Sequence, residues 1–146
     1  MQNEARIYSK SLEGNKQLTS SFKVKEFACN DGSDVILIHP DLPAVLQNIR
    51  NQFGKPIIIN SGYRTPEYNK KVGGATRSQH CYGTAADIVV DGVSPASVAI
   101  AAEKALKETG HPGGIGLYKS FVHVDVRSMK YRWDQRSGKE VAVSGF

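Results

Sequence analysis

Two short apolar segments of this sequence carry ionisable residues inside what otherwise predicts buried β-strands. Residues 85–90 read AADIVV and place Asp87 among small and branched side chains. An isolated buried carboxylate costs many kcal/mol, so Asp87 requires a cation, hydrogen-bond donors or a metal ion. Residues 121–127 read FVHVDVR, and the two-residue period of a strand puts the valines on one face and His123 and Asp125 on the other. We expect the valines to pack in the core, so that His123 and Asp125 face a functional site or solvent.

The remaining apolar patterning predicts an α+β fold. Apolar residues recur at helical spacing over 41–53, and a second helix is predicted over 94–110, where Ser-Pro supplies a favourable start. Strands are predicted at residues 35–38, 56–60, 85–90, 115–118 and 121–126. The last two are joined tightly and predict an antiparallel pair, while the continuous apolar run of 56–60 predicts an interior strand. Because helices and strands do not alternate regularly, we expect a central antiparallel sheet with flanking helices.

The length of the chain allows one domain. It has 146 residues, too few for two ordinary domains, and its apolar content of 40% argues against global disorder. Residues 1–17 are polar without a sustained period, which predicts a loosely held N-terminal arm. We expect the domain itself over residues 18–128 and a basic, aromatic C-terminal tail, residues 129–146, packed on it.

Charge and hydropathy exclude several classes of protein. No apolar run approaches the ~20 residues of a membrane span. The N-terminus lacks the apolar core of a signal peptide, so we expect a chain that is made in the cytoplasm or has lost a leader. The formal net charge of +5 suits an anionic partner. Basic residues cluster only at 127–136, around Tyr131 and Trp133, and without a nucleic-acid-binding signature this cluster predicts a solvated surface more than a binder of single strands.

The two cysteines do not indicate a disulfide framework. Cys29 and Cys81 are far apart in the sequence and form no CxxC motif. Whether they pair depends on a fold that brings them together in an oxidising compartment.

A metal site is one way to accommodate the ionisable residues of the two strands. His80 precedes Asp87 by seven residues, and Gly83 between them lets the chain turn so that both side chains can meet. With His123 they form a set of two imidazoles and one carboxylate, which leaves a fourth position for water as in catalytic zinc sites. The alternative is that each histidine is simply hydrogen-bonded and that Asp87 pairs with Arg64 or Arg127.

The order of these residues resembles the zinc D-Ala-D-Ala carboxypeptidase family. The family pattern is S-G-Y-R, then S-x-H-x-x-G-x-A-x-D, then a late His, and it matches residues 61–64, 78–87 and 123 of this chain. The family includes vancomycin-resistance D-Ala-D-Ala dipeptidases and phage L-alanyl-D-glutamate endolysins, and the hedgehog signalling domain shares its fold. The resemblance runs from about Leu18 to Arg127. It implies a hedgehog-like zinc peptidase fold with one Zn²⁺ ion, held by His80, Asp87 and His123.

The resemblance also implies roles for residues around the metal. Arg64 matches the family arginine that holds the scissile carbonyl or the substrate carboxylate, and the alternative is a structural ion pair with a buried acid. Ser78 matches a substrate-contacting hydroxyl at the edge of the cleft, and the alternative is a cap of the turn. Tyr63, within the S-G-Y-R motif, is expected to contribute to substrate binding.

The chain departs from the family pattern at the general base. Many relatives carry Asp or Glu three residues before the last histidine ligand, and this chain has Ser120 there. Asp125 is the nearest acid in the sequence and shares a strand face with His123. It is either the catalytic base or an acceptor that orients an imidazole.

The favoured function is a monomeric zinc metallopeptidase that cleaves peptidoglycan stem peptides, either at the terminal D-Ala-D-Ala bond or at an internal bond as phage lysins do. It would act at the bacterial cell wall, and a prophage origin would account for release from the cytoplasm without a signal peptide. The alternative is a non-catalytic, zinc-stabilised module that binds the wall or belongs to a phage particle, and Ser120 is the feature that favours it.

Overall fold

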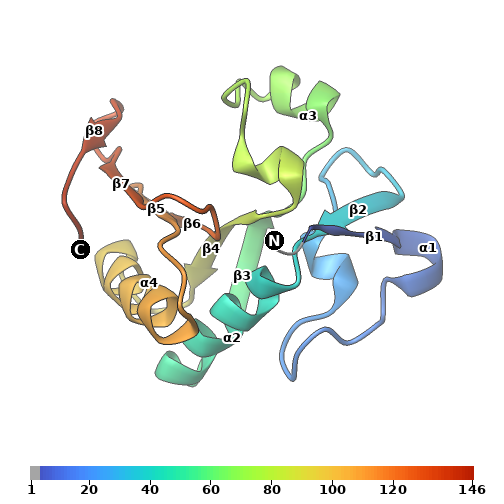
Figure 1. The fold of residues 1–146 in the computed structure, drawn as a ribbon, viewed down its shortest axis with the longest axis horizontal. Helices are drawn as coiled ribbons and strands as arrows, with labels where there is room; N and C mark the ends of the chain where they lie inside the picture. The colour runs from blue at the N-terminus through green and yellow to red at the C-terminus, as the bar shows by residue number, and fades with distance from the viewer. Residues whose placement is uncertain (1–3) are drawn as a thin grey trace.

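The computed structural model describes residues 4–146 and combines two sheets with four α-helices and two short 3₁₀ helices (Figure 1). The helices are α1 (Lys10–Glu13), η1 (Val24–Phe27), α2 (Asp41–Phe53), α3 (Pro66–Lys71), η2 (Gln79–Tyr82) and α4 (Pro95–Thr109). The strands are β1 (Arg6–Ser9), β2 (Val35–Ile38), β3 (Ile57–Ser61), β4 (Ala85–Val90), β5 (Gly114–Leu117), β6 (Val122–Asp125), β7 (Tyr131–Asp134) and β8 (Val141–Ala142). The predicted α+β class is confirmed.

The main sheet has six strands in the order β3-β4-β6-β5-β7-β8. Every neighbouring pair is antiparallel except β5 and β7, which run parallel. The prediction that residues 56–60 form an interior strand is wrong, because β3 lies at the edge of this sheet and Ile58 is 55% exposed. Apolar side chains on both faces of a short run do not distinguish an edge strand from a central one.

Helices α2 and α4 pack against each other, and α4 covers one face of the sheet along β4, β5 and β6 (Figure 1). Helix α4 begins at Ser94, whose hydroxyl accepts a hydrogen bond from the Ser97 backbone N–H, and it ends at Gly110 in the left-handed conformation. Val122 and Val124 of β6 are fully buried in the core, as the alternation of residues 121–127 predicts. The opposite face of the same strand carries His123 and Asp125.

The C-terminal residues extend the sheet beyond what the sequence predicts. Strand β7 pairs with β5, and its alternation sends Arg132 to the helical side, where its guanidinium binds the Glu103 carboxylate at 2.8 Å and the Gly113 carbonyl at 2.7 Å. Tyr131 and Trp133 lie on the other side. A strand that alternates basic and aromatic residues has no apolar period to reveal it, so the tail was expected only to pack on the domain.

The N-terminal residues form part of a second, smaller sheet. Of the predicted arm, residues 1–3 lie outside the described residues. Within the remainder, β1 pairs antiparallel with β2, and the backbone N–H of Lys10 donates to the Asp34 carbonyl oxygen. No helix among residues 4–146 is long and apolar enough to span a bilayer. Cys29 and Cys81 are both free thiols.

Candidate metal centre

His80, Asp87 and His123 come together from three elements, η2, β4 and β6. The Asp87 Oδ1 atom lies 3.2 Å from His80 Nε2 and 3.1 Å from His123 Nδ1, and one ligand atom from each residue lies within 4.8 Å of the others. Asp87 and His123 are direct partners in the register of β4 and β6, which fixes their separation. All three side chains are buried.

The backbone orients the imidazole of His80. Its Nδ1 lies 2.7 Å from the Gly62 carbonyl oxygen, which can only accept, so Nδ1 donates to it and Nε2 is the nitrogen that faces Asp87. Gly62 is required because a Cβ there would lie 2.8 Å from the Phe27 backbone. Gly83, in the left-handed conformation, then turns the chain from η2 into β4.

Asp125 orients the imidazole of His123 in the same way. The Asp125 Oδ2 atom accepts a 2.7 Å hydrogen bond from His123 Nε2, so Nδ1 is the nitrogen that faces Asp87. Arg127 donates to both oxygens of this carboxylate, from Nε to Oδ1 at 2.9 Å and from its terminal nitrogen to Oδ2 at 2.7 Å. The two imidazole nitrogens that face Asp87 and the Asp87 carboxylate form a donor set that fits a zinc ion with an open fourth position.

The surroundings of Asp125 bear on its two expected roles, the catalytic base and the acceptor that orients an imidazole. Its side chain is fully buried, and both oxygens are already engaged by Arg127 and His123. It contacts His123 through Nε2, the nitrogen that does not face Asp87. The second of the two expected roles, an acceptor that orients the imidazole, is therefore the one this arrangement supports.

Two glycines of β5 make room for this arrangement. Gly114 is the register partner of Asp125, and a Cβ there would collide with the carboxylate of Asp125 and with Arg127 Nε. Gly116 is the register partner of His123, and its missing side chain is replaced by the indole of Trp133, which packs directly over it. The ring centroids of Trp133 and His123 are 5.1 Å apart. The pair of glycines thus lets an aromatic wall stand beside the histidine.

Arg64 both pairs with Asp87 and reaches the cleft. Its guanidinium lies 3.4 Å from Asp87 Oδ2 and also donates to Ser61 Oγ at 3.0 Å and to Asn69 Oδ1 at 3.2 Å. The Asn69 amide is held in turn by the Ala75 carbonyl oxygen. The two expected roles of Arg64 are compatible, because a guanidinium has five donors and this one still lines the open space above the cluster.

A cleft of ≈ 630 Å³ opens over the three candidate ligands. Part of its lining consists of Arg64, residues 72–75 and residues 77–79. An aromatic wall, together with polar side chains, comes from later residues that the sequence did not assign to the site: Tyr118, Phe121, Tyr131, Trp133, Gln135 and Glu140. The sequence signal for this wall is the pair of aromatic residues Tyr131 and Trp133, which lies in the basic cluster that predicts a solvated surface.

The structure separates the two residues expected to bind substrate. Ser78 lines the cleft, and its hydroxyl also accepts a 3.2 Å hydrogen bond from the His80 backbone N–H, so it caps η2 as well. Tyr63 is 7% exposed, packs in the core and does not line the cleft. The expectation that Tyr63 binds substrate is therefore corrected. Tyr63 follows Gly62, which lies close against the Phe27 backbone of η1, and its side chain points into the core.

Burial and hydrogen bonding act in opposite directions on the cluster. Burial alone would raise the pKa of Asp87, but hydrogen bonds with His123 and His80 hold it well below the ordinary value. Burial would lower the pKa of His123, yet the carboxylates of Asp125 and Asp87 raise it to about 9. The cluster therefore favours a positive charge between His123 and Asp87, the place that a divalent cation would take.

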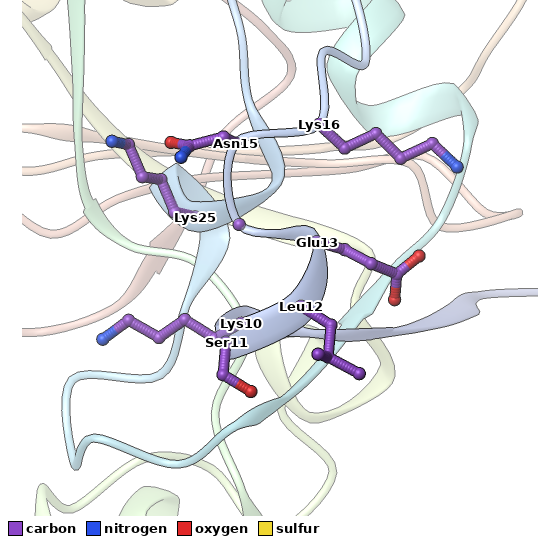
Figure 2. A pocket seen from close by; sticks show the side chains of 8 residues that line it. Lys10, Ser11, Leu12, Glu13, Asn15, Lys16 and Lys25 are labelled. Atoms are coloured by element: carbon purple, nitrogen blue, oxygen red, sulfur yellow. The ribbon is translucent and has the colours of Figure 1, made fainter.

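A second concavity lies near the N-terminus and has different chemistry. It is lined by residues 10–16 and Lys25, and it contains no histidine. Figure 2 shows that the ammonium group of Lys16 points away from those of Lys10 and Lys25, so these cations do not converge on one point. The cleft above His80, Asp87 and His123 is therefore the candidate functional site.

Comparison with known proteins agrees with this site. The zinc D-Ala-D-Ala carboxypeptidase of Streptomyces albus G is 50% identical over 44 residues, which span 30% of this chain and 17% of that protein. The L-Ala D-Glu endopeptidase ChiX of Serratia marcescens shares the fold with a TM-score of 0.50 and 24% identity, covering 62% of this chain and 80% of that one. The family model "Peptidase M15" matches residues 17–125, which include all three candidate ligands. The chain therefore belongs to the peptidase M15 family.

Proposed function

We propose that this chain is a zinc-dependent metallopeptidase that cleaves peptide bonds in peptidoglycan stem peptides. The observation that carries the proposal is the convergence of His80, Asp87 and His123, with each imidazole held by a hydrogen bond through the nitrogen that faces away from Asp87. Membership of the peptidase M15 family supports a peptidase, and the donor set supports zinc as its cofactor.

The zinc ion would be held by His80 Nε2, Asp87 Oδ1 and His123 Nδ1. When bound, such an ion lowers the pKa of a coordinated water toward 7 and polarises the carbonyl of the scissile bond. Asp125 and the Gly62 carbonyl oxygen keep the two imidazoles in place from behind. The protein thus supplies a preorganised site, and little rearrangement is needed when the metal binds.

Arg64 is proposed to hold an anionic group of the substrate. Its guanidinium lines the cleft while Ser61, Asn69 and Asp87 fix its direction. A guanidinium in this position can receive a terminal carboxylate in a bidentate fashion or stabilise negative charge that develops on the scissile carbonyl oxygen. Ser78, which also lines the cleft, is proposed to contact the peptide backbone.

Glu140 is the proposed proton acceptor. Ser120, at the position of the usual acid, lines a separate cavity of ≈ 90 Å³ behind β4 and not the cleft. Among the described residues that line the cleft, the acids are Asp87 and Glu140, and Asp87 is a proposed metal ligand. Glu140 is exposed and is fixed by a hydrogen bond from the Tyr131 hydroxyl. From there it would accept the proton of the attacking water directly or through one intervening water, and return it to the leaving amine.

The proposed substrates are the stem peptides of peptidoglycan. The names of the two relatives specify a D-Ala-D-Ala bond in one case and an L-Ala-D-Glu bond in the other. The carboxypeptidase match covers only 17% of that protein, so it does not choose between them. Both substrates carry carboxylates, which suits the arginines of the cleft, Arg64, Arg77 and Arg127.

The test is digestion of purified peptidoglycan, with the soluble products identified by mass spectrometry. We expect the zinc-loaded protein to release D-Ala or fragments with a new amino terminus, and we expect a chelator to abolish the release. Recovery of product release after Zn²⁺ is added back would show that the activity depends on the metal. Bound zinc without any product from several types of cell wall would overturn the peptidase proposal. It would favour the non-catalytic wall-binding module, which the serine at position 120 in place of the usual acid also favours.

A further inference from the structure

We propose that the hydroxyl of Tyr118, which lines the cleft together with Arg64, donates a hydrogen bond to the substrate carbonyl oxygen. This inference rests on the proposed peptidase function and adds a catalytic residue to it. It assigns a task to the aromatic wall, which neither the family motif nor the metal site explains.

The backbone presents Tyr118 to the metal side of the sheet. Tyr118 follows β5 directly, and its N–H donates to the Phe121 carbonyl oxygen at 3.0 Å. Strand alternation places it on the same face as Gly116, the register partner of His123. Its ring stacks on Phe121 with centroids 4.3 Å apart and an interplanar angle of 13°, and both rings line the cleft. The side chain is therefore held rigidly, as a group that must meet a transition state should be.

The hydrogen-bond partners of Tyr118 leave its proton unused. The indole Nε1–H of Trp133 donates to the Tyr118 oxygen at 3.2 Å. An indole nitrogen is a donor only, so the tyrosine acts as the acceptor in this contact. Within residues 4–146, no carbonyl or carboxylate oxygen accepts from the Tyr118 hydroxyl. The O–H can therefore turn toward a substrate in the cleft while Trp133 fixes the oxygen.

The surroundings of Tyr118 place it among the groups of the site. Burial raises the pKa of its hydroxyl, and the nearby charges of Asp87 and Arg64 act on it in opposite directions, so both belong to its immediate electrostatic environment. Trp133, which holds its oxygen, is also the residue that packs against His123. A phenol with a raised pKa stays protonated at neutral pH and remains a donor throughout the reaction.

Peptide hydrolysis creates a need for such a donor. As the water oxygen bonds to the carbonyl carbon, the π electron pair moves onto the carbonyl oxygen, and it returns when the C–N bond breaks and the amine leaves with a proton. A fixed donor aimed at that oxygen stabilises the charged intermediate more than the substrate. Arg64 and Tyr118, which both line the cleft, would act on this oxygen together.

The test is Tyr118→Phe, which removes the hydroxyl and keeps the ring that stacks on Phe121. Loss of one preorganised donor of this kind lowers kcat by roughly 10²-fold. We expect that loss with little change in KM, an unchanged zinc content, and a comparable loss of affinity for a phosphinate analogue of the tetrahedral intermediate. Tyr82→Phe, on an exposed tyrosine that does not line the cleft, is the matched control and should match the wild type.

Three results would overturn the inference. If the wild type cleaves peptidoglycan and Tyr118→Phe does so equally well, Tyr118 has no catalytic task although the peptidase proposal stands. If Tyr118→Phe loses zinc along with activity, its role is structural. If the wild type cleaves nothing and does not bind the phosphinate, the proposed function itself fails, and the inference fails with it.

Discussion

His123 donates a 2.7 Å hydrogen bond from Nε2 to the fully buried carboxylate of Asp125. This contact leaves Nδ1 as the nitrogen that faces Asp87, and it sets the side of the His123 ring that would bind a metal. Arg127 balances the charge of the carboxylate through paired hydrogen bonds. The metal site therefore depends on a residue two positions away that would not touch the metal.

Replacing Asp125 by Asn should weaken zinc binding. An amide lacks the charge that keeps His123 Nε2 protonated, and loss of such a supporting acceptor typically lowers metal affinity by about 10–100-fold. Competition with a chromogenic chelator would measure the change, with circular dichroism as the check on folding. Asp91→Asn, at an exposed position, serves as control. An affinity equal to that of the wild type would show that the hydrogen bond does not tune the ligand.

Replacing Glu140 by Gln should lower turnover and leave zinc bound. A positioned general base contributes about 10²–10⁴-fold to rate, and the amide cannot accept a proton. Glu67→Gln, a carboxylate outside the cleft, should behave as the wild type. A variant of Glu140 with full activity would assign the base to another group.

Gly116→Ala should displace Trp133 from its place beside His123. The added Cβ would collide with the indole ring, and overpacking of this kind costs about 1–3 kcal/mol of unfolding free energy. Trp133 is the single tryptophan of the chain, so its fluorescence reports the displacement directly. Gly138→Ala removes a glycine with open space around it and controls for the loss of glycine alone, although its positive φ adds strain. An unchanged emission spectrum in Gly116→Ala would contradict the packing described above.

The pair of Glu103 and Arg132 should make stability depend on pH. Burial would raise the pKa of Glu103, but hydrogen bonds from Arg132 and the Phe146 backbone N–H outweigh it and lower the pKa below 4.5. The unfolded state therefore binds more protons in this range, so this contribution to stability is full above about pH 4.5 and is lost as the pH falls through the folded-state pKa.

Glu103→Gln should remove the pH dependence that this pair contributes to stability. It also leaves Arg132 buried without a counter-charge, which should lower the free energy of unfolding by about 3–5 kcal/mol near neutral pH. Denaturant unfolding at several pH values measures both effects. Glu108→Gln, on the same helix, is the control because, among residues 4–146, its carboxylate accepts only from the side-chain amide of Asn48. Equal pH dependence in wild type and Glu103→Gln would show that the pair is not coupled to folding.

The candidate ligands could be predicted from sequence because local rules determine their positions. Asp87 and His123 interrupt apolar strands, and strand alternation alone assigns His123 and Asp125 to the face opposite the valines. The predicted helices over 41–53 and 94–110 agree with α2 and α4 for the same reason, since apolar period and end signals are local. The orienting role of Asp125 remained one of two alternatives, because only the register with β5 shows that its carboxylate is enclosed.

The aromatic wall of the cleft could not be predicted in this way. Strand β7 is held by a parallel pairing with β5 and by the contact of Arg132 with Glu103, which lies 29 residues away in the sequence. Neither interaction produces an alternating apolar pattern in residues 131–134 that would indicate a strand. The prediction that Tyr63 binds substrate has a related weakness. A motif gives the position of a residue in the sequence but does not say on which side of the backbone its side chain lies.

Zinc titration of the metal-free protein, followed by Trp133 fluorescence and by metal analysis after gel filtration, tests the central claim most directly. We expect one equivalent of Zn²⁺ to bind and to change the emission of Trp133, whose ring lies 5.1 Å from that of His123. His80→Ala and His123→Ala should bind none, whereas His111→Ala, outside the cleft, should bind one. Wild-type protein that retains no zinc, or His80→Ala and His123→Ala variants that retain a full equivalent, would contradict the account.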